Sequence, residues 1–196
     1  TDAFNLYANC ASFVPAMFVA LAGAMVVYTN RMKSHTLRHF ASRSAMLLVA
    51  AARIDVVVWR TVPFVGMDIL YLTAVALPVA YVFQRLRAPL RWFLVAAVFG
   101  VTPLLQAWMG YAPRIFTISI FSVSPSMHVP VGKILNQWLV GGWFPVFPWV
   151  GFAMLGANLG ILRLGSMPKP FANWRTLAAG AAIRGAGIVM WRLYDG

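Results

Sequence analysis

Long apolar stretches separated by short and mostly basic loops dominate this sequence. A helix that crosses a bilayer needs about 20 largely apolar residues, and the chain contains six stretches of roughly that length. We expect spans over residues 11–28, 44–59, 64–83, 90–109, 143–164 and 174–193. Only 10% of the residues are charged, against about 25% in soluble domains. The sequence therefore predicts an all-α, polytopic transmembrane helical bundle of about six spans, forming a single domain over residues 1–196.

Charge is distributed unevenly between the loops. Ten of the sixteen Lys and Arg residues fall after the first, third and fifth stretches, four fall on the opposite side, and two lie inside spans. The four carboxylates, Asp2, Asp55, Asp68 and Asp195, all fall at or near the side with fewer bases. Cytoplasmic loops are enriched in Lys and Arg, so the basic side is predicted to be cytoplasmic and both termini extracytoplasmic. A bacterial-type inner membrane is the expected location.

Several classes of function are disfavoured by the same pattern. A net charge of +12 is typical of nucleic-acid-binding proteins, but here the positive-inside rule accounts for the bases. We therefore predict membrane lipids, and no nucleic acid, as partners. The single Cys10 permits no internal disulfide. His35 and His39 have the i, i+4 spacing of a helical metal pair but no third ligand nearby, so no metal site is predicted.

The longest connection, residues 110–142, is predicted to lie on the extracytoplasmic side. Loops of this length are usually functional or disordered, and an apolar composition argues against disorder here. Its alternating β-branched stretch, Arg114 to Val123, predicts a strand or a re-entrant segment. The connection also contains His128, the only histidine expected on this side. An imidazole titrates near neutral pH, so His128 is the candidate catalytic base; a solvated side chain without a catalytic role is the alternative.

Four charged residues fall inside or at the edge of predicted spans, where ionisable side chains are functional candidates by default. They are Arg53, Asp55, Asp68 and Arg184. Arg53 and Asp55 are two residues apart and face different sides of a helix, so each is expected to find a partner on another helix. Asp55 and Asp68 are candidate catalytic residues that would orient a base, and Arg53 is a candidate for holding an anionic group. The alternatives are a structural Arg–Asp pair and Arg stems that reach the headgroups.

Basic side chains in the predicted cytoplasmic loops form a second candidate site. The candidate ligands for phosphate are Arg31, Lys33, Arg38, Arg85 and Arg87. Such side chains bind phosphate through charge-assisted hydrogen bonds. Phospholipid headgroups satisfy the same cluster without a specific function, so a phosphate-bearing cosubstrate and lipid binding are both open interpretations.

Small residues in the fifth stretch predict how it packs. Gly151, Gly156 and Gly160 recur along one helix, and small residues let the backbones of membrane helices approach closely. Asn158 lies between them and is a candidate for a hydrogen bond across helices.

Four segments of the chain resemble, in order, segments of a known family of membrane enzymes. GGWFPVFPWVGFAMLGANLG (Gly141 to Gly160) is similar to an FP-x-x-PW-x-GF-x-x-x-G run, and FVPAMFVALAGAM (Phe13 to Met25) is similar to a helix that ends in a basic loop. GMDILYL (Gly66 to Leu72) resembles a D-x-L helix start, and TPLLQ (Thr102 to Gln106) follows in the expected order. The family is the heparan-α-glucosaminide N-acetyltransferase-like group of membrane acyltransferases, and the resemblance covers most of residues 11–165.

The resemblance implies a reaction across the membrane. Such enzymes take acetyl-CoA from the cytoplasmic side and acetylate a sugar amine or hydroxyl on the far side. A luminal or periplasmic histidine in the loop after the family's first helix is regarded as central. The first ten residues of this chain, TDAFNLYANC, contain no histidine. The family's first helix and several C-terminal helices are also missing, so we expect a fragment or a reduced relative.

Two main functions are consistent with these features. The first is an acetyl-CoA-dependent membrane acyltransferase, in which His128, Asp68 and Arg53 converge on one polar cavity. The second is a non-catalytic structural subunit of a larger membrane complex, of the respiratory or light-harvesting type, with dispersed charges and an apolar flank against neighbouring subunits. A small transporter or flippase is a third alternative and requires a polar path from the basic side to Asp68.

Overall fold

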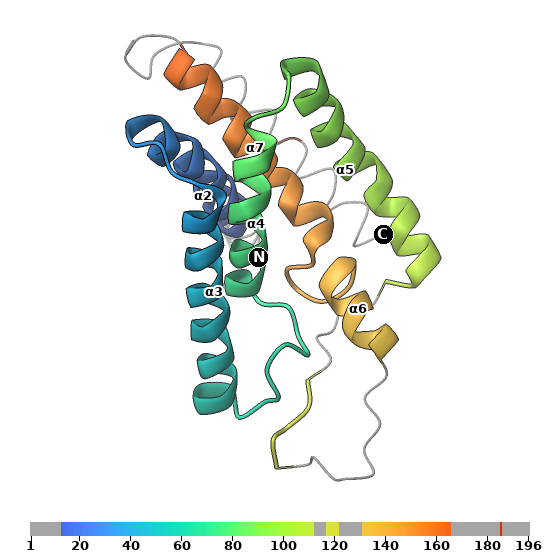
Figure 1. Cartoon of the computed structure of the whole chain (residues 1–196). Helices are drawn as coiled ribbons and strands as arrows, with labels where there is room; N and C mark the ends of the chain where they lie inside the picture. The colour runs from blue at the N-terminus through green and yellow to red at the C-terminus, as the bar shows by residue number, and fades with distance from the viewer. Residues whose placement is uncertain (1–12, 112–116, 122–130, 166–184, 186–196) are drawn as a thin grey trace, which may run out of the picture.

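The computed structural model describes residues 13–111, 117–121, 131–165 and 185. Within these residues the chain forms six α-helices and one short π-helical segment, and no named strand. In chain order the elements are α2 (Phe13–Met32), α3 (Leu37–Ile54), η1 (Asp55–Trp59), α4 (Ile69–Phe83), α5 (Ala88–Met109), α6 (Val131–Leu139) and α7 (Val146–Gly165). The all-α class is confirmed for this part of the chain (Figure 1).

Three helices, α2, α5 and α7, are long and apolar enough to cross a membrane. They correspond to the predicted spans 11–28, 90–109 and 143–164, with ends that differ by up to four residues. The predicted span 174–193 lies outside the described residues. The prediction of six spans is therefore not confirmed, because the second and third predicted spans fall short for two different reasons.

The second predicted span, 44–59, proves to be the later part of a longer and more polar helix. α3 begins at Leu37, and its first turns carry Arg38, His39 and Arg43. Phe40, Ser44 and Ala51 are buried on one face, so one stripe packs inward while the basic side chains stay outside. The apolar part alone suggested a start at Ser44, but the basic turns continue the same amphipathic helix.

The third predicted span, 64–83, is shorter than expected. Residues 64–68 are not helical, and α4 begins at Ile69 with Asp68 as its N-cap. At 15 residues, α4 is about 22 Å long, which is less than the roughly 30 Å of a hydrocarbon core. It is nevertheless central, since it packs against α2, α3 and α7, and Tyr71 and Leu72 are fully buried.

α2 and α7 cross at very short range through small residues. A Cβ added to Gly156 would overlap the carbonyl oxygen of Ala20, and one added to Gly23 would overlap that of Ala153. The close packing predicted for the glycines of the fifth stretch is thus confirmed. Asn158 is buried beside them, but its Nδ2 has no hydrogen-bond partner among the described residues, so the predicted bond across helices is not found for that atom.

The ends of the helices lie in two groups. The C-terminal ends of α2, α4 and α7 and the N-terminal ends of α3 and α5 lie together, at the top of Figure 1. We call this the basic end, because its helix ends and loops carry most of the described Lys and Arg residues. Asp55 and Asp68 lie at the opposite end of α3 and α4, which we call the aspartate end.

Residues 117–121 of the connection over residues 110–142 pair with the chain that follows η1. Thr61 and Ser119 form an isolated antiparallel bridge. Val62 N–H donates to the carbonyl of Ile118 (2.7 Å), and Ile120 N–H donates to that of Arg60 (3.0 Å). The predicted strand over Arg114 to Val123 is thus a single bridge in the described residues 117–121. The connection also contains α6, a helix that was not predicted from the sequence.

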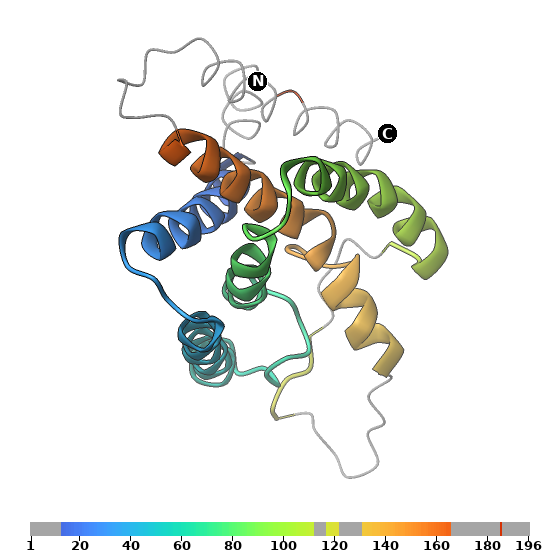
Figure 2. The same cartoon turned by 45° about the horizontal axis from the view of Figure 1, so that its top comes forward.

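α5 is the most weakly covered long helix. It packs mainly against α7 and leaves the large apolar side chains of Phe93, Leu104 and Trp108 exposed. Figure 2 shows it at the edge of the described helices. In a membrane, lipid or another protein would cover this flank.

Candidate functional site

Asp55 and Tyr71 form the central contact of the aspartate end. The Tyr71 hydroxyl donates a hydrogen bond to Oδ2 of Asp55 (2.6 Å) and accepts one from the N–H of Phe64 (3.3 Å). The partner of Asp55 on another helix is therefore a tyrosine hydroxyl of α4 and not an arginine. The expectation of a partner on another helix is confirmed, but the partner carries no charge.

The backbone around Asp55 departs from regular helix. α3 passes at Asp55 into the π-helical segment η1, and Arg60 ends this segment in the left-handed region (φ 54°, ψ 39°). Thr61 then turns back, and its N–H donates to the carbonyl of Asp55 (2.9 Å). Phe64 also has a positive φ of 65°. Glycine adopts positive φ angles most readily because it has no Cβ. Two non-glycine residues with positive φ within five positions of the chain are therefore unusual.

Two aromatic side chains pack against the ring of Tyr71. The Tyr71 ring lies 5.3 Å from that of Phe64 and 5.7 Å from that of Trp138, measured between centroids. Trp138 belongs to α6, and its Nε1–H donates to the carbonyl of Phe64 (2.9 Å). Through Trp138, the 110–142 connection therefore packs against Tyr71, the partner of Asp55. It also bonds to Phe64, in the segment between η1 and α4.

Asp68 lies at the same end, but its side chain caps the N-terminus of its own helix, α4. Its Oδ1 accepts a hydrogen bond from the N–H of Ile69, the first residue of α4. A side chain in this position satisfies one of the unpaired N–H groups at a helix start. Of the two candidate aspartates, Asp55 is thus the one whose carboxylate contacts a side chain of another element.

Of the other two candidates for this end, the structure describes only Arg53. Arg53 is exposed on α3, and none of the contacts described above involves its side chain. His128 lies outside the described residues. The expected convergence of His128, Asp68 and Arg53 on one polar cavity therefore remains a prediction.

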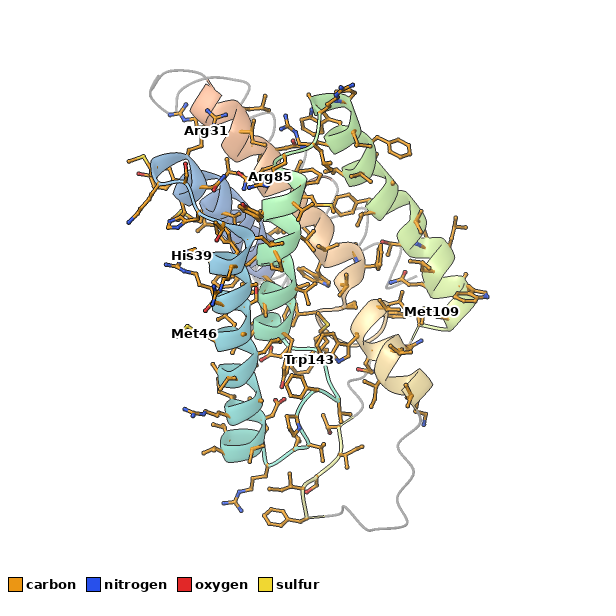
Figure 3. The ribbon with its side chains drawn as sticks, in the orientation of Figure 1. Arg31, His39, Met46, Arg85, Met109 and Trp143 are labelled. Atoms are coloured by element: carbon orange, nitrogen blue, oxygen red, sulfur yellow. The ribbon has the colours of Figure 1, made fainter. Side chains whose placement is uncertain are left out.

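The candidate phosphate ligands all lie at the basic end. Arg31 ends α2, Lys33 and Arg38 flank the start of α3, and Arg85 and Arg87 lie between α4 and α5. All five side chains are exposed. Figure 3 shows Arg31 and Arg85 at this end. Two chain segments far apart in sequence, around the α2–α3 loop and the α4–α5 loop, thus present positive charge at the same end. Such side chains bind phosphate through charge-assisted hydrogen bonds.

A network of rings and hydroxyls supports Arg85. Its Nη2–H donates to the Tyr81 hydroxyl, and its Cζ lies 4.4 Å from the centre of the Tyr81 ring. The Tyr81 hydroxyl in turn donates to the carbonyl of His35 (3.0 Å), and Asn30 accepts from the N–H of His35 (3.2 Å). The loop between α2 and α3 is thereby tied to the end of α4.

His35 and His39 stack instead of chelating. Their rings are 3.9 Å apart and nearly parallel, with an interplanar angle of 10°. Desolvation, followed by electrostatic interaction with His35, Arg43 and Lys33, lowers the pKa of His39. No group of three His, Cys, Asp or Glu side chains able to hold a metal is found in the described part of the chain. Stacked rings present their faces to each other, so this pair is not arranged to share a metal ion.

Tyr71, Tyr81 and Trp138 were not singled out from the sequence. Each lies in a stretch whose apolar composition predicts packing, which hides the role of a single hydroxyl or indole N–H. One signal was present: a buried Tyr or Trp usually needs a hydrogen-bond partner, and Tyr81 precedes its partner Arg85 by four positions. For Tyr71 the nearest carboxylate in sequence, Asp68, would have indicated the wrong partner, since the hydroxyl bonds to Asp55.

Comparisons with known proteins agree with the segments described above. The family model described as heparan-alpha-glucosaminide N-acetyltransferase, catalytic, matches residues 2–189. A search of curated proteins and a search of solved structures each gave no match.

Proposed function

Because the chain belongs to the family of the heparan-alpha-glucosaminide N-acetyltransferase catalytic region, we propose that it is an integral membrane acyltransferase. It would take an acetyl group from acetyl-CoA and transfer it to an extracytoplasmic sugar or a similar acceptor. The observation that carries this proposal is the family match over residues 2–189. It is supported by the concentration of most described Lys and Arg residues at the basic end, with Asp55 and Asp68 at the opposite end.

The basic end is the proposed donor side. Acetyl-CoA carries several phosphate charges, and Arg31, Lys33, Arg38, Arg85 and Arg87 would hold them. The hydrogen bond from Arg85 to Tyr81 pre-orients one of these side chains, which reduces the entropy lost when the ligand binds.

The aspartate end is the proposed acceptor side. His128 would remove a proton from the acceptor amine or hydroxyl, with Asp55 or Asp68 orienting the imidazole and Arg53 holding an anionic group of a substrate. The acceptor nitrogen or oxygen attacks the thioester carbonyl carbon. The new C–N or C–O bond forms, the C–S bond breaks, and the CoA thiolate leaves and takes up a proton.

The short α4 reduces the distance that the acetyl group must cover. Tyr71 at the aspartate end and Tyr81 at the basic end are ten residues apart on this helix, which corresponds to about 15 Å along its axis. This is roughly half the thickness of a hydrocarbon core. The acetyl end of an extended donor bound at the basic end would therefore need to reach across only part of the membrane thickness.

The proposed orientation has the basic end in the cytoplasm, following the positive-inside rule. In a variant whose native Cys10 is replaced by Ser, we expect a membrane-impermeant thiol reagent added from outside to label Ser126→Cys. Ser34→Cys, exposed at the basic end, should react only after the membrane is permeabilised. The reverse labelling pattern would contradict the orientation.

The function itself is tested by acyl transfer in the full-length protein. We expect protein reconstituted in vesicles to release the CoA thiol from acetyl-CoA when glucosamine, which offers both an amine and hydroxyls, is supplied as the acceptor probe. Mass spectrometry of the acceptor should show the acetylated product. If no transfer occurs and the protein purifies in a stable, stoichiometric complex with other subunits, the structural-subunit alternative is favoured instead.

A further inference from the structure

We propose that Tyr71 is a positioning residue of this reaction: its hydroxyl holds the carboxylate of Asp55 in one orientation at the aspartate end. The inference rests on the proposed function, because it assigns a residue to the acceptor side of the same site. It adds a side chain that is not among the candidate residues predicted from the sequence.

The contact has the geometry of a specific and strong hydrogen bond. The distance of 2.6 Å between the Tyr71 hydroxyl and Oδ2 of Asp55 lies in the range of O–H···O⁻ bonds. A tyrosine hydroxyl can donate a single hydrogen bond, and here Oδ2 of Asp55 accepts it. The N–H of Phe64 occupies an acceptor position of the same oxygen, so the hydroxyl is fixed from both sides.

The ring that carries this hydroxyl cannot easily move. Tyr71 is fully buried, with 0% of its surface exposed, and the rings of Phe64 and Trp138 pack against it. Asp55, by contrast, is only partly buried. A rigid donor thus orients a carboxylate that is still accessible to a reacting group.

The backbone supplies an independent reason to assign a function here. A π-helical segment starts at Asp55, and Arg60 and Phe64 have positive φ angles. π-helical segments are frequent at functional sites, and unusual backbone conformations persist where the surrounding structure determines them. In this chain these features lie on both sides of the contact between Asp55 and Tyr71.

The test removes the hydroxyl and keeps the ring. In full-length protein in vesicles, with acetyl-CoA and glucosamine as the probes, we expect Tyr71→Phe to lower kcat by about 10- to 100-fold, the effect of losing one hydrogen bond to a charged group. KM for acetyl-CoA should stay within about twofold, because the donor side is at the other end of α4. The matched control is Thr73→Val, which removes a buried hydroxyl from the same helix whose bond goes only to the carbonyl of Ile69.

A double variant separates positioning from a purely structural role. If Tyr71 acts through Asp55, the pair Tyr71→Phe and Asp55→Asn should be no slower than Asp55→Asn alone. Wild-type rates in Tyr71→Phe, or additive losses in the double variant, would overturn the inference while leaving the proposed function in place. An inactive wild type would remove both. If Tyr71→Phe does not fold, Asp55→Asn alone decides, since full activity in it would leave Tyr71 nothing to position.

Discussion

Gly156→Ala is expected to destabilise the protein by about 3 kcal/mol, the upper part of the range for overpacked interiors. The physical reason is that the added Cβ would overlap the carbonyl oxygen of Ala20. This is a backbone atom that cannot rotate away, so α2 and α7 must separate along their contact. Equilibrium unfolding in detergent, followed by circular dichroism, measures the change.

The control for this prediction is Gly100→Ala on α5. A Cβ there meets nothing within 4 Å, and Ala is favoured over Gly inside a helix by about 0.8–1.0 kcal/mol. The control should therefore be as stable as the wild type or slightly more stable. Equal stabilities for Gly156→Ala and Gly100→Ala would show that α2 and α7 do not meet as closely as described.

His128→Ala is expected to reduce acyl transfer by about 10²- to 10⁴-fold, which is the usual contribution of a general base. His128 is the only histidine of the 110–142 connection, so no second imidazole of that segment can replace it. The rate of CoA thiol release in vesicles, with acetyl-CoA saturating, measures the effect. The protein should remain folded in detergent, as judged by its helical circular dichroism signal.

Ser126→Ala is the matched control, because it changes a polar side chain two residues away in the same segment. It should keep the wild-type rate. If His128→Ala also kept full activity, the base would have to be another group, and the assignment of His128 would be abandoned while the transfer reaction itself stood.

Most helices were predictable because helix formation in this chain follows local composition. Uninterrupted apolar stretches led to α2, α5 and α7 within a few residues. α3 was placed too late because its first turns are basic, and α4 was placed too early because the turn before Asp68 is as apolar as the helix. In both cases hydropathy alone was misleading. Burial of one stripe extends α3 into a polar segment, and the N-cap Asp68 sets where the apolar helix α4 begins.

The candidate site was predictable only as far as the ends of helices. The alternation of spans correctly placed Asp55 and Asp68 at one end and the five candidate phosphate ligands at the other. It did not distinguish the two aspartates. The cap made by Asp68 depends on where the segment before α4 ends, and the contact of Asp55 with Tyr71 depends on how α3 and α4 are rotated about their axes. For the same reason Arg53, two residues before Asp55, was predicted at a site to which its exposed side chain makes no described contact.

The sequence by itself determined which segments are apolar helices and which ends carry which charge, because the free energy of burying a side chain depends mainly on its own chemistry. Only the tertiary structure decided which side chains meet. Tyr71 and Asp55 are 16 residues apart, and Trp138 and Phe64 are 74 residues apart. Such contacts form only when each helix has a defined orientation about its own axis and each loop has a defined conformation. Packing among many residues selects that arrangement, and the close crossing of α2 and α7 through Gly23 and Gly156 is the part of it that leaves least freedom.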